Sequence, residues 1–168
     1  MNNKKFVIDI PLTVKGANGN KLANTTIDLV EGADGTVISG LNMEFTGNNP
    51  TGIIYAKDVS DIVISNNNIL ITDCTEQMMG IQILSEGTKT NNIAIKDNTI
   101  DITGTSKYIY GIDAYSEYSI AGATIDGLVI DGNDVTINGA STMAEAIYVS
   151  IASNVEITNN EVTTTSPG

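Results

Sequence analysis

The sequence predicts an all-β fold in which short parallel strands wind into a solenoid. The first observation is a repeated pattern of Ile, two residues, Asn, one residue and then Ile or Val. The second is alternation of aliphatic residues at every second position, without helical spacing. The third is a Gly-Ile or Ala-Ile pair at a fixed distance from each Asn. Recurrence of one short unit along a chain is typical of stacked coils.

The first element is an N-terminal lead-in and cap over residues 1–35. Residues 4–14 carry an apolar side chain at every second position, namely Phe6, Ile8, Ile10, Leu12 and Val14. The open end of a solenoid exposes apolar side chains and unpaired backbone groups. We therefore expect residues 4–14 to form a strand that covers the first coil.

The coils follow over residues 36–164, and we expect about five of them. The repeated Asn occurs at four positions: Asn67, Asn98, Asn133 and Asn160. A degenerate copy of the pattern has Leu41 in its place. The Gly-Ile or Ala-Ile pair begins at Gly52, Gly80, Gly111 and Ala146. The distance from Asn to the next pair is constant and the return distance varies, so we expect one half of each coil to be rigid and the other to accept insertions.

The repeated Asn suits a sharp corner between two strands. Asn tolerates the left-handed backbone conformation better than other residues with a side chain. Its amide carries two donors and an acceptor, so stacked Asn side chains can bond one another and the corner backbone. We expect Asn67, Asn98, Asn133 and Asn160 to form a buried ladder, with Leu41 closing one end as an apolar plug.

The C-terminal residues 165–168 form a polar tail. We expect the whole chain, 1–168, to be a single domain of β-helix. The last coil shows no covering element like the N-terminal one. Three explanations stay open: the tail suffices, another subunit covers this end, or the chain is a piece of a longer protein, which is the explanation that we favour.

The segment from Asp58 to Ile69, Asp-Val-Ser-Asp-Ile-Val-Ile-Ser-Asn-Asn-Asn-Ile, and the segment from Ser153 to Asn160 share one theme. They resemble repeats of right-handed parallel β-helices of the pectate-lyase-like superfold. The resemblance is nearest to adhesin-like surface proteins of bacteria and archaea, and it covers roughly residues 36 to 164. It implies a right-handed single-stranded β-helix. It implies no single activity, because lyases, hydrolases, epimerases, tailspikes and passive adhesins share this superfold.

The net charge of −12 excludes two classes of partner. An acidic surface repels nucleic acid and anionic membranes, and no stretch is long enough to insert into a bilayer. The N-terminal segment does not read as a signal peptide, because Asp9 and Pro11 interrupt its apolar run. We expect an extracellular or cell-surface location, with an export signal outside this sequence. Cys74 is the only cysteine, and we expect it to be a small buried or half-buried residue.

The sequence predicts no catalytic residues, no metal site and no cofactor. Lyases of the superfold use a basic residue as proton abstractor, and hydrolases use clustered Asp residues. The sequence contains no Arg. We expect two outward columns after the Gly-Ile pairs: Ile54, Gln82, Asp113, Tyr148 and Ala56, Leu84, Tyr115, Ser150. These columns hold one carboxylate and no Lys, although Glu86 and Glu117 on nearby loops could approach it. The turn-like segments 32–35 and 131–134 lack the ligand spacing of calcium loops.

Aromatic placement has two interpretations, a binding surface and the packing of a loop onto the sheet. Four of the six Tyr fall between residues 108 and 118. Tyr presents a flat apolar face and a hydroxyl, which suits sugar rings and protein contacts. The candidate binding residues are Tyr108, Tyr110, Asp113, Tyr115, Glu117, Tyr118 and Tyr148. The alternative is that these rings only pack the insertion loop, Ser116 to Gly127, onto the sheet.

Three functions therefore remain open. The first, which we favour, is a non-catalytic adhesin-like surface module that presents loops for binding a glycan or another surface protein. The second is a polysaccharide lyase or glycoside hydrolase. The third is a structural subunit that self-associates end to end into a fibre or oligomer.

Overall fold

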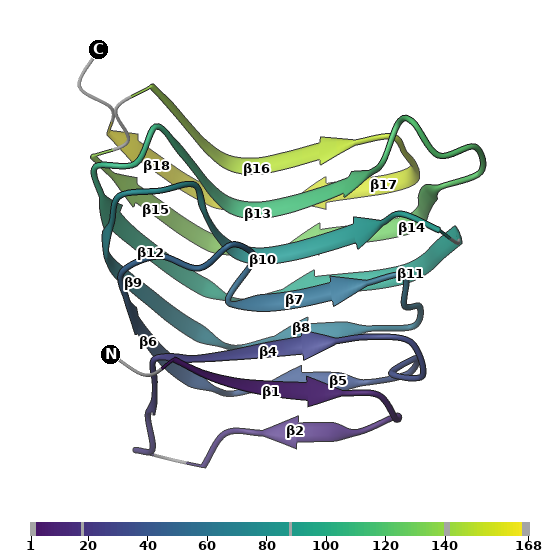
Figure 1. Ribbon diagram of the computed structural model, residues 1–168, viewed down its shortest axis with the longest axis horizontal. Helices are drawn as coiled ribbons and strands as arrows, with labels where there is room; N and C mark the ends of the chain where they lie inside the picture. Colours follow the sequence, from purple (N-terminus) through teal and green to yellow (C-terminus); the bar gives the residue numbers. More distant parts are fainter. Residues whose placement is uncertain (1–2, 18, 88, 140–141, 166–168) are drawn as a thin grey trace.

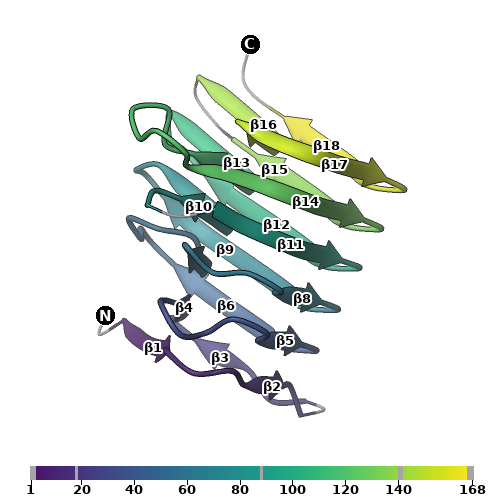
Figure 2. The ribbon, with the colours of Figure 1, turned by 90° about the vertical axis from the view of Figure 1, so that its right-hand side faces the viewer.

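The computed structural model describes residues 3–17, 19–87, 89–139 and 142–165. The chain is a right-handed parallel β-helix, with three parallel sheets of six strands each in the described residues (Figure 1). Every third strand in the sequence belongs to the same sheet, and strands lie in the sheets in sequence order. Each coil thus contributes one strand to each sheet, as Figure 2 shows from the side. This arrangement confirms the predicted fold class.

The eighteen strands divide among the three sheets as follows. Sheet A holds β1 (Lys4–Ile8), β4 (Thr25–Leu29), β7 (Ile54–Lys57), β10 (Met78–Ser85), β13 (Tyr108–Ser116) and β16 (Met143–Ser150). Sheet B holds β2 (Thr13–Lys15), β5 (Val37–Ser39), β8 (Val63–Ser65), β11 (Lys89–Lys96), β14 (Thr124–Asp131) and β17 (Ala152–Thr158). Sheet C holds β3 (Leu22–Ala23), β6 (Asn42–Thr46), β9 (Asn68–Cys74), β12 (Thr99–Gly104), β15 (Asp134–Asn138) and β18 (Glu161–Thr165).

The core consists of aliphatic columns that run along the axis of the solenoid. In sheet B, Ile38, Ile64, Ile95 and Ile130 are paired in register from strand to strand, and each is fully buried. β-Branched side chains favour this half-buried, pleated environment. Because parallel strands stack at about 4.8 Å, identical residues at one position pack directly on each other. The repeated Ile of the sequence is therefore the stacking residue of the core.

The predicted Asn ladder is present at the corner between sheets B and C. Nδ2 of Asn67, Asn98 and Asn133 each donates to Oδ1 of the next ladder Asn at 2.9 Å, ending at Asn160. The backbone N–H of the same three residues donates to that same oxygen. The second Nδ2 hydrogen reaches a backbone carbonyl of the preceding coil, at Ile38, Ile64, Ile95 or Ile130. Leu41 closes the first end, since it is 6% exposed and its N–H donates to Asn67 Oδ1.

The left-handed backbone lies one residue before the ladder, which corrects the expected reason for the Asn. The residues with positive φ at this corner are Gly40, Asn66, Asp97, Gly132 and Asn159. Gly, Asn and Asp are the residues that adopt this conformation at the least cost. The preceding residue therefore makes the turn, and the ladder Asn supplies the hydrogen bonds. The two roles are divided between neighbours in each coil.

The N-terminal segment forms a sixth coil rather than the single covering strand expected over residues 4–14. β1 pairs with β4 in sheet A and β2 with β5 in sheet B, and the chain turns between them. Pro11 lies in this turn, where its missing N–H and fixed φ prevent a continuous strand. The coil covers the edges of β4 and β5 but leaves its own apolar side chains exposed, Phe6 at 54% and Leu12 at 41%.

Close packing between successive coils explains the Gly that begins the Gly-Ile pairs at Gly80 and Gly111. A Cβ on Gly80 would lie 2.7 Å from both the Gly111 carbonyl oxygen and Cγ2 of Ile100. A Cβ on Gly111 would lie 2.2 Å from Cγ1 of Val135 and 2.6 Å from the Ala146 carbonyl oxygen. In the last coil this position carries a small side chain, that of Ala146, which is buried. The fixed distance from the Asn therefore leads to a position where two successive coils pack closely.

Candidate functional site

The outward face of sheet A carries its polar residues in columns set by strand register. The main column is Asp28, Tyr55, Gln82, Asp113 and Tyr148, and a second is Lys57, Leu84, Tyr115 and Ser150. The expected members Ile54 and Ala56 are wrong by one position, since both are fully buried. The cause is an extra buried residue, Ile53, between Gly52 and the first paired Ile of this strand.

This shift changes the chemistry expected of the face. Lys57 stands in the second column, where it forms an ion pair with Glu86, and Asp28 stands in the main column with Lys5 as its partner at 2.6 Å. A third column places Glu145 beside Tyr110. The expectation of a single carboxylate and no Lys on this face is therefore wrong.

Four of the candidate residues line one recess of about 200 Å³, together with Gln77. They are Tyr110, Asp113 and Tyr115 from β13 and Tyr148 from β16. The rings of Tyr110 and Tyr148 meet edge to face, with centroids 5.8 Å apart and an interplanar angle of 64°. This geometry is the favoured arrangement of an aromatic pair and holds both rings in place. The recess thus has aromatic walls from two successive coils.

Asp113 lies at the base of this recess and is 4% exposed. Its Oδ2 accepts a hydrogen bond from Gln82 Nε2 at 3.0 Å, and Gln82 Oε1 accepts one from the Gly52 N–H at 3.1 Å. Burial raises the pKa of Asp113 to about 6, the Gln82 hydrogen bond opposes that rise, and the charge of Glu145 adds to it. Burial of a carboxyl that has no cationic partner disfavours its ionised form, because the charge loses its hydration. Such a group is typical of a binding or reactive site.

The pKa values of the tyrosines around the recess are raised as well. Burial raises the pKa of Tyr110 and Tyr115, and neighbouring carboxylates, Glu145 and Asp113 among them, raise them further. These phenols stay protonated at neutral pH and can donate hydrogen bonds. In the described residues, Oε2 of Glu145 is buried without a hydrogen-bond partner. The recess therefore combines phenol donors with carboxylate acceptors.

The other three candidate residues lie outside the recess. Tyr108 is 40% exposed at the start of β13, and Tyr118 is 86% exposed in the loop after that strand. Glu117 accepts hydrogen bonds from the N–H and hydroxyl of Ser119, which hold it within the same loop. The Tyr cluster is therefore divided: Tyr110 and Tyr115 of β13 lie beside the recess, whereas Tyr118 follows the end of the strand.

Sequence reasoning did not identify Gln77, Gln82 or Glu145 as parts of the site. Gln82 appeared in a predicted column, and its position opposite Asp113 was the available signal. The available signal for Glu145 was its place directly before Ala146, which matches the place of Tyr110 directly before Gly111. Residues 140 and 141, in the insertion before β16, lie outside the described residues.

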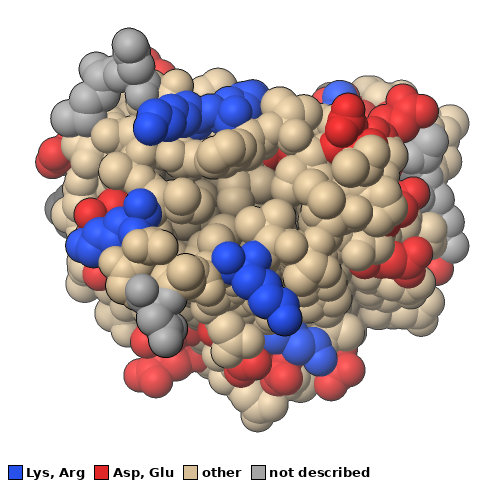
Figure 3. Space-filling model, turned by 90° about the horizontal axis from the view of Figure 1, so that it is seen from below, with Lys and Arg blue, Asp and Glu red and all other residues tan. Residues whose placement is uncertain are grey.

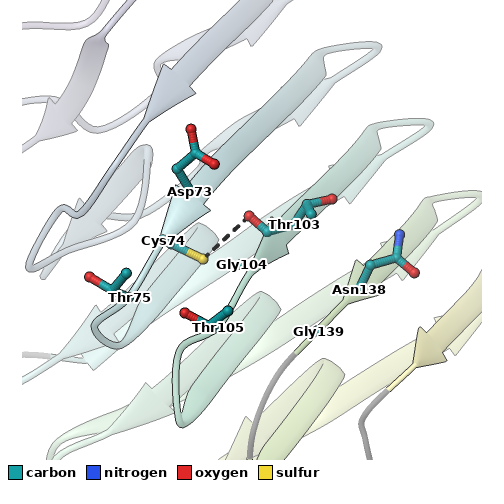
Figure 4. A pocket seen from close by; sticks show the side chains of 8 residues that line it. All are labelled: Asp73, Cys74, Thr75, Thr103, Gly104, Thr105, Asn138 and Gly139. Carbon is teal, nitrogen blue, oxygen red and sulfur yellow. Dashed lines mark hydrogen bonds between the residues drawn. The ribbon is translucent and has the colours of Figure 1, made fainter.

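A second recess, of about 380 Å³, lies at the end of sheet C near Cys74 (Figure 4). Gly104 and Gly139 form part of its wall, and a Cβ on Gly104 would lie 2.2 Å from Cys74 Sγ. Cys74 is fully buried, as expected, and burial raises the pKa of its thiol. The only carboxylate that lines this recess is that of Asp73. A buried, protonated thiol is a poor nucleophile.

Among the described residues, no group of three or more His, Cys, Asp or Glu side chains is placed to hold a metal ion. The described chain also contains no helix with the length and hydrophobicity needed to cross a membrane. The segments 32–35 and 131–134 serve as corners, with positive φ at Gly32, Gly35 and Gly132. Comparison of the chain with models of protein families, with curated proteins and with solved structures gives no match.

Proposed function

We propose that this protein is a non-catalytic, adhesin-like surface module that binds a saccharide in the tyrosine-lined recess of sheet A. The observation that carries the proposal is the convergence of Tyr110, Tyr115 and Tyr148 around the buried carboxyl of Asp113. Aromatic faces pack against the apolar C–H faces of sugar rings, while phenol and carboxylate groups exchange hydrogen bonds with sugar hydroxyls. A rigid solenoid holds these groups in fixed positions before the ligand arrives.

The size of the recess limits the ligand to a small unit. Its volume of about 200 Å³ lies below the roughly 300–1,000 Å³ of pockets that enclose drug-sized molecules. We therefore expect one sugar residue or chain end to enter, with modest affinity at each site. The net charge of −12 favours neutral or cationic saccharides over acidic ones. An extracellular or cell-surface location is part of this proposal and is consistent with such a ligand.

Isothermal titration calorimetry with a panel of neutral, amino and acidic oligosaccharides tests the proposal. We expect at least one neutral or amino sugar to bind, and Tyr148→Ala to weaken it about tenfold or more, the loss typical of a central aromatic contact. Tyr118→Ala is the matched control, because Tyr118 is 86% exposed and lies outside the recess. Binding that survives Tyr148→Ala, or that falls equally in both variants, would contradict the assignment.

One observation favours a second candidate function, polysaccharide cleavage. A carboxyl whose pKa is raised to about 6 can act as a general acid, and Glu145 is the nearby carboxylate that contributes to that rise. In glycoside hydrolases, a protonated and an ionised carboxyl flank the scissile bond. Assays for new reducing ends and for unsaturated products distinguish the two functions. Product release by the wild type, abolished in Asp113→Asn, would replace the binding proposal with a catalytic one.

A further inference from the structure

The two ends of the solenoid carry matching apolar positions. Three buried columns run through the core from the first coil to the last, and their end members are Phe6 and Ile147, Val14 and Ile157, and Leu22 and Val162. Interior members of these columns are at most 2% exposed. Three of the end members are about half exposed: Phe6 at 54%, Ile157 at 48% and Val162 at 52%. Each end thus exposes the position that every interior coil buries.

The N-terminal end also contains an apolar hollow. A recess of about 370 Å³ is lined by residues of the first coil, including Phe6, Leu12, Val14 and Leu22, and it reaches Leu41 of the next coil. Viewed from this end, Lys side chains surround the uncharged central surface (Figure 3). Four of the eight Lys of the chain, Lys4, Lys5, Lys15 and Lys21, lie in this coil, against one acidic residue, Asp9.

The C-terminal end has the opposite charge. From Met143 onward the described chain contains three acidic residues, Glu145, Glu156 and Glu161, and no Lys. Two of them match lysines in position. Glu161 precedes Val162 as Lys21 precedes Leu22, and Glu145 stands two residues before Ile147 as Lys4 stands two before Phe6. The charge pattern therefore has the same register as the apolar columns.

We infer that the C-terminal coil of one molecule stacks on the N-terminal coil of a second copy of this chain. In that junction all three sheets continue, because the strands of each last coil are parallel to those of the first and have free edges. The columns meet as Ile147 on Phe6, Ile157 on Val14 and Val162 on Leu22. Lys21, which is already paired with Glu44 in its own chain, faces Glu161 across the junction. The inference is independent of the proposed saccharide site.

This contact joins two different surfaces, so it leads to open filaments rather than closed dimers. Burial of the exposed column ends supplies the main attraction, because apolar surface removed from water is the dominant favourable term in association. The complementary charges orient the two ends and disfavour contacts between like ends. Head-to-head contact would place Lys against Lys, and tail-to-tail contact would place Glu against Glu.

Sedimentation velocity from low to high micromolar concentration tests the inference on the 168-residue chain. We expect the wild type to form a concentration-dependent series of oligomers. Phe6→Glu blocks the N-terminal end, because it places a charge opposite Ile147 and near Glu145 of another copy. Val162→Lys blocks the C-terminal end, because it places a charge opposite Leu22 and next to Lys21. We expect each variant to raise the dissociation constant at least about tenfold, equal to 1.4 kcal/mol.

A mixture of the two variants gives the sharpest test. Each variant keeps one intact end, so an equimolar mixture should form a one-to-one dimer and nothing larger. Tyr118→Glu and Tyr118→Lys are the matched controls, since they place the same charges on an exposed aromatic residue that belongs to none of the three columns. Circular dichroism checks that all variants fold, which we expect because Phe6 and Val162 are about half exposed. A monomeric wild type, oligomers of either variant alone, or a monomeric mixture would each overturn the inference.

Discussion

The Asn corner and the outward face of sheet A differ in how fully their buried polar groups are hydrogen-bonded. At the corner, the amides of Asn67, Asn98 and Asn133 use their oxygen and both of their hydrogens within the fold. On the outward face, Asp113 is buried with its pKa raised and Oε2 of Glu145 is buried without a hydrogen-bond partner among the described residues. The corner repeats in every coil from the third onward, whereas the Tyr and carboxyl cluster occurs once. A repeated network of satisfied hydrogen bonds stabilises the solenoid, whereas a single cluster with a raised pKa and an unpartnered carboxylate oxygen supports the proposed binding site.

Breaking the ladder should have the largest effect. Asn98→Ala removes an acceptor shared by the N–H and Nδ2 of Asn67, and a donor to Ile64 and Asn133. Each buried polar group left without a partner costs about 1–3 kcal/mol, so we expect unfolding by urea to show a loss of about 3–5 kcal/mol. Asn68→Ala is the control, because Asn68 follows the ladder residue Asn67 in the chain but is exposed. Equal losses in the two variants would mean that the ladder gives no stability of its own.

Filling a close approach between two coils should have the next largest effect. In Gly104→Ala the new Cβ would lie 2.2 Å from Cys74 Sγ and 2.4 Å from the Cys74 carbonyl oxygen. Because a backbone oxygen cannot rotate away, strand β12 must shift, and such overpacking costs about 1–3 kcal/mol. Thermal unfolding measures the loss. In Gly87→Ala the nearest atom to the new Cβ would be Asp58 Oδ2 at 3.7 Å, so this control should unfold like the wild type.

The repeated Asn corner could be predicted from the sequence, whereas the recess of sheet A, which occurs once, could be predicted only in part. The spacing of Asn67, Asn98 and Asn133 fixed the stack, because every coil must satisfy the same register. The four predicted residues of the recess come from β13 and β16, where the outward positions follow the spacing of the repeated pair. In β7 the extra buried residue Ile53 moved the outward positions by one, which hid Tyr55 and Lys57. The left-handed residues were misassigned for a similar reason. Asn66 and Asn67 are adjacent and of one type, so composition alone did not separate the turn from the ladder.

The opposite prediction applies to Asp113, where removing a charge should stabilise the fold. A carboxyl whose pKa is raised by folding holds its proton more tightly in the folded state, so its contribution to stability falls as pH rises from about 4 to about 6. Asp113→Asn stays neutral and can still accept the Gln82 hydrogen bond. We expect a gain of up to about 1–3 kcal/mol above pH 6 and none below pH 4, from the size of the pKa shift.

Urea unfolding at pH 4 and pH 7.5, compared between variant and wild type, measures that gain. Asp131→Asn is the control of opposite sign, because hydrogen bonds from Asn159 and Thr158 lower the pKa of Asp131 and its stabilisation is lost as pH falls. In the Asp113→Asn variant, saccharide affinity should fall and should no longer depend on pH near 6. A stabilised Asp113→Asn protein that binds as well as the wild type would separate the unsatisfied carboxyl from binding.

The smallest expected effect concerns the aromatic pair of the recess. A double-mutant cycle with Tyr110→Ala and Tyr148→Ala should give a coupling of about 0.5–1.5 kcal/mol in urea unfolding, the usual value of an edge-to-face pair. Tyr148 is 37% exposed, so its removal alone should change stability little. The same substitution should nevertheless abolish most saccharide affinity. A large stability loss with unchanged affinity would instead assign the rings to packing the strand edges. The Asn corner and the recess of sheet A would then both serve to stabilise the fold and would differ only in how much they contribute.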